Sequence, residues 1–137
     1  MILGLSIPTL LLGSIFVAVF LVYFPYLAVA YARFQVGMDF GAPRAMFDRL
    51  PDYGKRATWA HQNSIETFAP YAAAALAAYV TGVDSSAAGW SAVAFVGART
   101  LFSVAYIANI PVLRSLMFGI GQVSMLTLFV QALQRVA

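Results

Sequence analysis

Residues Ile7 to Ala32 read IPTLLLGSIFVAVFLVYFPYLAVAYA, a run without one charged side chain that ends directly before Arg33. About 20 predominantly apolar residues are enough for a helix to cross the roughly 30 Å of hydrocarbon in a bilayer. This run meets that length, and a water-soluble domain has little room for so long an apolar segment. The stretch therefore predicts a membrane-spanning helix.

Three more apolar stretches follow, at residues 56–80, 87–109 and 112–133. None shows the strict alternation of a strand, and an open sheet could not satisfy its backbone groups in lipid. Hydrophobic residues make up 62% of the chain and charged residues 9%, whereas soluble domains carry about 25% charged residues. The sequence thus predicts an all-α membrane protein. We expect one domain, residues 1–137, folded as an antiparallel four-transmembrane-helix bundle with helices at 7–32, 56–80, 87–109 and 112–133.

The first stretch has one alternative interpretation, a cleaved signal peptide. Ala28, Val29 and Ala30 resemble a small-residue cleavage site. However, no basic residue precedes the apolar run, and the run is longer than the core of a typical signal peptide. We therefore expect the segment to be retained as the first span.

The basic residues gather between the apolar stretches and give the chain its formal net charge of +3. The first loop and its borders hold Arg33, Arg44, Arg49, Lys55 and Arg56, and Arg114 follows the third loop. Basic residues favour the cytoplasmic side of a membrane. We therefore expect loops one and three in the cytoplasm and both termini on the opposite side, with membrane lipids as partners and no nucleic acid.

Cysteine is absent, which excludes disulfides and thiolate metal sites within this chain. The single histidine, His61, has no carboxylate or thiol nearby with which to share a metal ion. We therefore expect no metal site. Any thiol chemistry must use a thiol that a substrate brings.

The connections between the stretches differ in length. The first, about residues 34–55, is long and rich in glycine and proline, whereas the other two are short. Short connections favour antiparallel neighbouring helices. Asn109 precedes Pro111 by two residues, and proline disfavours helix in the residue before it. We therefore expect the third helix to end at Asn109.

Two ionisable residues lie well inside the predicted spans, Glu66 in the second and Arg99 in the third. Such a residue costs about 2.5–3.5 kcal/mol at the centre of a spanning helix and usually pairs inside the bundle. The two residues lie at similar predicted depth on antiparallel neighbours. The sequence therefore predicts that they share one polar network, and it leaves open whether they touch directly.

Polar and aromatic side chains accompany these two residues at helical spacing. The second span carries Trp59, Gln62, Asn63 and Glu66 on one face, and the third carries Arg99, Phe102, Ser103 and Tyr106. The fourth span begins near Arg114 and Ser115, where we expect free backbone N–H groups that favour an anion. Together these features predict a polar cleft, open to the cytoplasm, that holds a charged ligand while an apolar partner arrives through lipid.

Structural explanations compete with this functional one. A glutamate and an arginine in a helix bundle can form a purely structural pair. His61 can face the membrane interface, and Tyr23, Tyr26 and Tyr31 are typical interfacial or packing aromatics. The sequence alone does not separate these explanations from a ligand site.

Two motifs resemble those of a known family. Residues 60–67 (AHQNSIET) resemble the second-helix motif A-H-x-N-x-x-E of the MAPEG proteins, which act in eicosanoid and glutathione metabolism. Arg99 to Tyr106, followed by Arg114 and Ser115, is similar to the third-helix and fourth-helix motifs of the same family. The resemblance extends over nearly the whole chain.

The resemblance implies a homotrimer that binds glutathione between neighbouring subunits near the cytoplasmic side. Carried over by position, the residues around the tripeptide would be Arg33, Asn63, Glu66, Arg99, Tyr106, Arg114 and Ser115. Glu66 would accept from the glutathione amine, Asn63 would bind its backbone, and Arg33 would meet a carboxylate. Arg99 would tie the site to Glu66 or to the ligand. The catalytic group would be Arg114, Ser115 and Tyr106, with the first two stabilising the thiolate.

The implied function is that of a glutathione-dependent transferase or peroxidase acting on lipophilic electrophiles in the membrane. Trp59 and Gln62 stand where glutathione-binding members carry arginine, so two cations that could meet the glutathione carboxylates are missing. Two alternatives therefore stay open. One is a non-catalytic membrane scaffold or lipid-binding protein with this fold, and the other is a small proton-coupled transporter that uses Glu66.

Overall fold

The computed structural model covers residues 1–137 and is all-helical, as the sequence predicts. The elements are, in order, α1 (Ile7–Gln35), the 3-10 helix η1 (Pro43–Arg49), α2 (Asp52–Val80), α3 (Ser86–Ile107) and α4 (Pro111–Val136). The only β feature is an isolated bridge between Ile2 and Leu5 in the N-terminal turn. That turn folds back over the start of α3, where Ile2 packs against Gly89.

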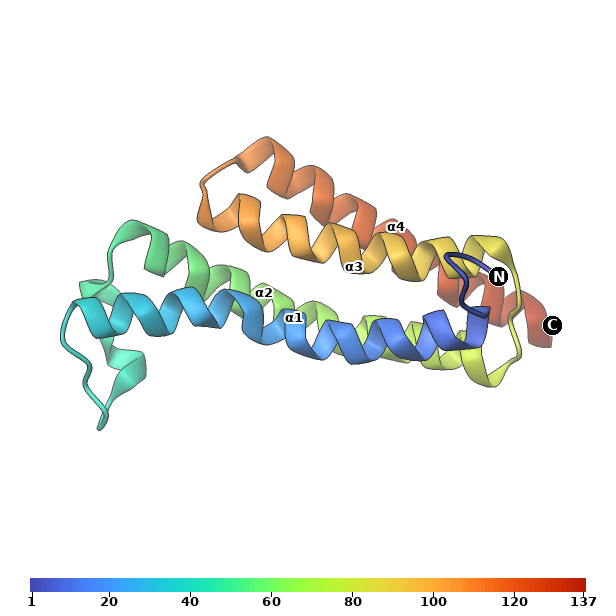
Figure 1. Cartoon of the computed structure of the whole chain (residues 1–137), viewed down its shortest axis with the longest axis horizontal. Coiled ribbons are helices and arrows are strands. Elements are labelled where there is room, and N and C mark those ends of the chain that lie inside the picture. The colour runs from blue at the N-terminus through green and yellow to red at the C-terminus, as the bar shows by residue number, and fades with distance from the viewer.

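The four long helices lie side by side and alternate in direction (Figure 1). Helix α1 packs against α2 and α3, and α4 packs against α3 and α2, so α2 contacts all three other long helices. Both chain termini lie at the end where α2 connects to α3. The α1–α2 and α3–α4 connections lie toward the opposite end, which is the arrangement that alternating helices give.

Helix α2 starts at Asp52, four residues before the predicted boundary at residue 56. Pro51 occupies the N-cap position with extended backbone angles, and the Asp52 carboxylate lies in the first turn. An acidic side chain there interacts favourably with the positive end of the helix dipole. Three other boundaries also move outward, since α1 continues to Gln35 and α4 both begins earlier, at Pro111, and ends later, at Val136.

Helix α3 ends at Ile107, so the prediction that it ends at Asn109 is wrong by two residues. Asn109 lies just beyond the helix in a left-handed conformation, with φ of 61°. The following amide, that of Ile110, donates to the carbonyl oxygen of Ala105 at 2.8 Å, and this closes the helix end. Asparagine tolerates this conformation better than most residues. Gly82 ends α2 in the same way, with φ of 70°.

The connection between α1 and α2 contains regular structure that the sequence did not predict. Within it, η1 buries Met46, and Leu50 is buried directly after η1. The Arg49 guanidinium donates to the carbonyl oxygen of Val36 at 2.9 Å, which ties the end of η1 to the end of α1. The aromatic ring of Phe47 lies 5.8 Å from that of Trp59 on α2. The connection is therefore packed against the helices rather than extended away from them.

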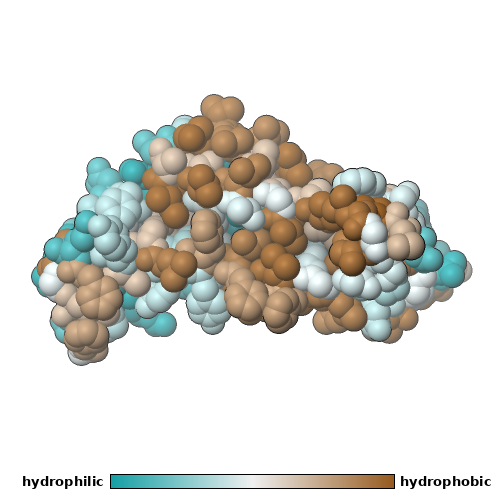
Figure 2. Space-filling model, in the orientation of Figure 1, coloured by the Kyte–Doolittle hydropathy of each residue, from teal (hydrophilic) through white to brown (hydrophobic).

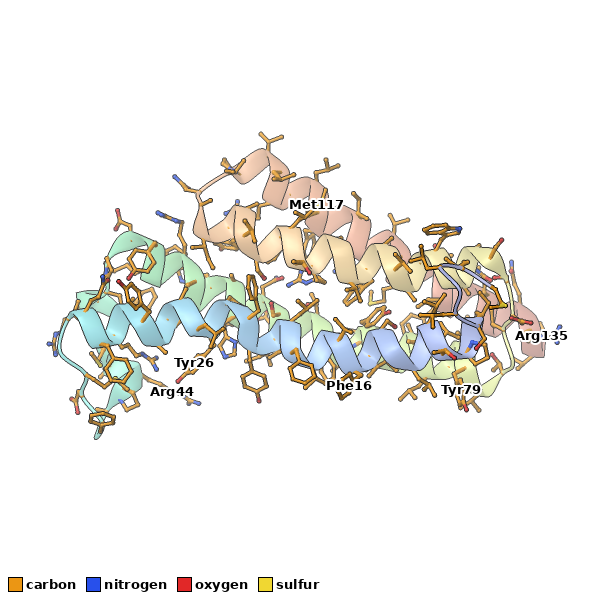
Figure 3. The ribbon with its side chains drawn as sticks, in the orientation of Figure 1. Phe16, Tyr26, Arg44, Tyr79, Met117 and Arg135 are labelled. Atoms are coloured by element: carbon orange, nitrogen blue, oxygen red, sulfur yellow. The ribbon has the colours of Figure 1, made fainter.

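Three of the four long helices, α1, α3 and α4, are long and apolar enough to cross a membrane. Helix α2 does not meet this criterion, contrary to the prediction of four apolar spans. Its first half carries charged and amide side chains, and its apolar residues are mostly alanines with little hydrophobic surface. Large apolar side chains such as Phe16 point outward from the helices (Figure 3). Apolar residues gather over the middle of one face, with more polar ones toward the ends (Figure 2).

The core lies where α2 meets its neighbours through small residues. The alanine-rich run of α2 is buried there, with Ala74, Ala75 and Ala78 fully inaccessible. Tyr71 stacks on Phe95 with 3.4 Å between ring centroids, and its hydroxyl donates to the Ser14 hydroxyl at 2.6 Å. Small side chains let helix backbones approach closely, and this is the usual basis of helix packing in membranes.

Helices α1 and α2 approach closely at Gly54. A Cβ atom added there would lie 2.7 Å from Cβ of Ala32. We expect Gly54→Ala to force the two helices apart, because neither Cβ can rotate away, and overpacking costs about 1–3 kcal/mol. The apparent melting temperature in detergent should fall. Gly97→Ala is the matched control, because nothing lies within 4 Å of its added Cβ, and equal melting temperatures for the two variants would contradict the close approach.

Candidate functional site

A polar cavity of about 470 Å³ opens between α2 and the end of α3. Four of its lining residues come from one face of α2 and the fifth from α3: Trp59, Gln62, Asn63, Glu66 and Tyr106. The four α2 residues are those that the sequence placed on one stripe at three- and four-residue spacing. Helical periodicity therefore predicted this wall of the cavity. The cavity is shallow and widely open to its surroundings.

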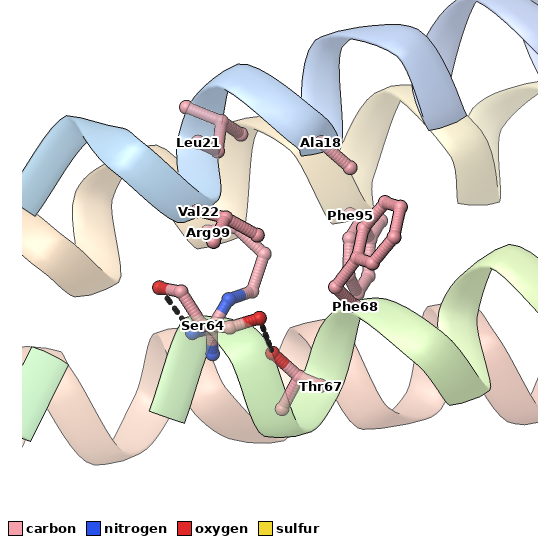
Figure 4. A pocket seen from close by; sticks show the side chains of 8 residues that line it. All are labelled: Ala18, Leu21, Val22, Ser64, Thr67, Phe68, Phe95 and Arg99. Atoms are coloured by element: carbon pink, nitrogen blue, oxygen red, sulfur yellow. Dashed lines mark hydrogen bonds between the residues drawn. The ribbon is translucent and has the colours of Figure 1, made fainter. Parts of the chain in front are cut away.

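Arg99 lies behind this cavity, buried between the helices with 4% of its surface exposed. Its Nη2 donates to Oδ1 of Asn63 at 2.9 Å and to Oγ of Ser64 at 3.2 Å. The guanidinium carbon lies 4.1 Å from the centroid of the Phe102 ring. Figure 4 shows the guanidinium beside Ser64, where Arg99 lines a small, partly open cavity of about 10 Å³. Nη1 has no partner in the protein.

Glu66 is exposed to the polar cavity and accepts a hydrogen bond from Nε2 of Gln62 at 3.3 Å. The prediction that Glu66 and Arg99 share one polar network is therefore wrong within the single chain. The structure has two hydrogen-bonded pairs, Gln62 with Glu66 and Arg99 with Asn63. The guanidinium meets Asn63, about one helical turn before Glu66 on α2, and only its Nη2 is paired there, while Nη1 stays without a partner.

The Arg99 contact also orients the amide of Asn63. A guanidinium has only donors, so Asn63 must turn Oδ1 toward Arg99 and its NH₂ group away from it. Asn63 also lines the polar cavity. The cavity wall thus combines an amide NH₂ donor with the carboxylate acceptor of Glu66, which lies one turn further along the helix.

Arg114 lies at the edge of the cavity, with its guanidinium carbon 4.6 Å from the centroid of the Tyr106 ring. Its own amide donates to the carbonyl oxygen of Ile110 at 3.0 Å. The expectation of free backbone N–H groups at Arg114 and Ser115 is therefore wrong. Because α4 already begins at Pro111, the unpaired N–H groups of its first turn fall before Arg114. Ser115 is exposed on α4 and its hydroxyl makes no hydrogen bond within the chain.

Arg33 lies apart from the cavity. It is buried on α1, where its Nη1 donates to the hydroxyl of Tyr26 at 3.4 Å and Nε has no partner. Of the predicted site residues, the structure places Asn63, Glu66 and Tyr106 in the cavity wall. Arg99 and Arg114 contact that wall, whereas Arg33 and Ser115 do not.

Two polar contacts near the site were missed by sequence reasoning. Nε of Arg56 donates to the carbonyl oxygen of Ile107 at 2.9 Å, which holds the start of α2 against the end of α3 at the cavity mouth. Nδ1 of His61 lies 2.6 Å from the carbonyl oxygen of Val22 on α1. Arg56 was interpreted only as a topology charge. No sequence signal marks either contact, because both partners are backbone carbonyls.

The arrangement combines an acceptor, a donor and two cations around one opening. A carboxylate, an amide NH₂ group and a phenol line the cavity, and the Arg99 and Arg114 guanidiniums stand just outside it. Such a set can bind a zwitterionic or peptide-like ligand through its amine and amide groups. It can also stabilise an anion that forms near Tyr106, since positive charge nearby favours the ionised form of an acid.

Comparison with known proteins identifies the family. The model of the MAPEG family matches residues 10–134. No curated protein and no solved structure matches the chain. The family match spans nearly the whole chain, and with the three apolar helices it identifies an integral membrane protein. The chain belongs to the MAPEG family.

Proposed function

We propose that this protein is a glutathione-dependent transferase or peroxidase that acts on lipophilic electrophiles dissolved in the membrane. The observation that carries the proposal is the polar cavity between α2 and α3, whose donors and acceptors suit a small peptide. Family membership supports the same class of activity. The cavity opens beside helices that are apolar enough for lipid, so a water-soluble thiol and an apolar substrate can meet there.

The residues present fit the amine end of glutathione better than its carboxylates. Glu66 can accept from an ammonium group, and the NH₂ group of Asn63 can donate to a peptide carbonyl. The two arginines that glutathione-binding members carry are replaced here by Trp59 and Gln62. Arg99 and Arg114 are therefore the cations of this chain nearest to the site.

The chemical step would be attack by the glutathione sulfur on an electrophilic carbon. The thiol proton passes to water, the thiolate then forms a new carbon–sulfur bond, and the bond from that carbon to its leaving group breaks, so that the leaving group departs with the electron pair. A thiol with an ordinary pKa near 8.5 is mostly protonated at neutral pH. Arg114 and the hydroxyl of Tyr106 would favour the thiolate, and the cavity would supply proximity to the substrate.

A homotrimer of four-span subunits would complete the site. In this arrangement α2 crosses the membrane as well, shielded from lipid by the helices that it contacts on several sides. Arg33 lies on a different part of the chain from the cavity, so a neighbouring subunit would bring its own α1 to the open side. The basic first connection would face the cytoplasm, with both termini opposite.

The direct test is calorimetric binding of glutathione to the detergent-purified protein. We expect saturable binding, weakened about tenfold by Glu66→Gln, because hydrogen bonds to charged groups contribute about 1.5–3 kcal/mol and the site is partly open to water. Asp84→Asn is the matched control, since this carboxylate lies in the α2–α3 connection, away from the cavity. No binding at millimolar glutathione would exclude the proposal and leave the non-catalytic scaffold.

A second test addresses the role of Arg114. We expect Arg114→Ala to raise the pKa of the bound glutathione thiol toward its value in water, because a nearby cation stabilises the anion. The fraction of thiolate, followed by ultraviolet absorbance as pH is varied, should then fall at neutral pH. Arg135→Ala, at the far end of α4, should leave the pKa unchanged. A thiol pKa that is the same in both variants would remove Arg114 from the mechanism.

A further inference from the structure

Arg99 carries a positive charge that no acidic side chain of the chain pairs with. Its two hydrogen-bond partners, Asn63 and Ser64, are both neutral. Glu66, which lies on the same helix as these partners, bonds Gln62 instead. The other four acidic residues lie in the connections or at the start of α2: Asp39, Asp48, Asp52 and Asp84. A permanently charged guanidinium is therefore held between the helices without a counterion.

The small cavity that Arg99 lines is built by α1, α2 and α3 together (Figure 4). It shares no lining residue with the polar cavity, and none of its lining residues is acidic. Apart from Arg99, its polar side chains are the hydroxyls of Ser64 and Thr67, and both already donate to backbone carbonyl oxygens of α2. The guanidinium is therefore the group of this cavity that has hydrogen-bond donors to spare.

Nη1 of Arg99 is a buried donor that lacks an acceptor. The residue exposes only 4% of its surface, and Nη1 has no hydrogen-bond partner. A guanidinium has no acceptor of its own, so the missing partner must be an acceptor. A water molecule accepts the hydrogen bond but leaves the charge unbalanced in a setting where an isolated charge is costly. An anion satisfies the donor and balances the charge at once.

We propose that this cavity binds one chloride ion against Nη1 of Arg99. A cavity of about 10 Å³ suits a single small particle rather than sulfate or an organic acid. A halide accepts hydrogen bonds from any direction, so it needs no second oriented donor. Because the cavity exists only when α1, α2 and α3 are packed, the bound ion stabilises the folded state. The site is separate from the proposed glutathione site and does not depend on it.

The test follows the apparent melting temperature of the full-length protein in detergent, without glutathione, as sodium chloride replaces sodium gluconate at constant ionic strength. We expect a saturable rise with chloride, and the same with bromide, because gluconate is too large for the cavity. Asn63→Asp places a fixed carboxylate against the guanidinium, which should fold and should weaken the apparent chloride affinity at least about tenfold. Gln62→Glu is the matched control, since it adds the same charge to α2 away from Arg99 and should keep the chloride dependence.

A second measurement locates the ion. Crystals of the unmodified protein grown in sodium bromide should show one anomalous peak beside Nη1 of Arg99, and crystals of Asn63→Asp should lack it. Equal melting temperatures in chloride and gluconate would overturn the proposal, and would mean that water or a second copy of the chain meets the guanidinium. A chloride dependence that survives in Asn63→Asp, or a bromide peak only at other positions, would also overturn it and would indicate an adventitious ion only.

Discussion

The guanidinium of Arg99 is the constraint on which the arrangement of α2 and α3 depends. It is buried in an apolar interior, where a charge without partners is expensive. Its partners are side chains of α2, Asn63 and Ser64. Because both lie on one turn of α2, the contact fixes the rotation of that helix against α3. The same contact turns the amide of Asn63, so the polarity of the cavity wall follows from the position of one buried cation.

Helix α2 carries polar side chains on more than one face. One face carries the amide and carboxylate side chains of the polar cavity, and another carries His61 in a groove toward α1. A helix exposed to lipid could not hold so many polar groups. Helix α2 contacts all three other long helices, so much of its surface is covered by protein. Helix α3 also contacts all three and is apolar enough to cross a membrane, so the low hydropathy of α2 comes from its polar side chains and not from its position alone.

The sequence predicted the helices and one wall of the site, because both follow from local periodicity. The stripe from Trp59 to Glu66 follows from 3.6 residues per turn, and the structure places it in one cavity. Contacts across helices were not predictable in the same way. Similar depth in the membrane suggested that Arg99 and Glu66 share a polar network. However, the rotation of each helix about its own axis decides which side chains face each other, and Arg99 faces Asn63. The contact of His61 with a backbone carbonyl has no sequence signal at all.

The most direct test of this account is a double-mutant cycle between Arg99 and Asn63, read out as the free energy of unfolding. Asn63→Ala alone should be clearly destabilising. The buried Arg99 guanidinium has two hydrogen-bond partners, Asn63 and Ser64, and this substitution removes the nearer one. In an Arg99→Met background the same change should cost little, so the coupling should be at least about 1 kcal/mol. Additive effects would mean that the pair does not fix α2 against α3, and would contradict the account.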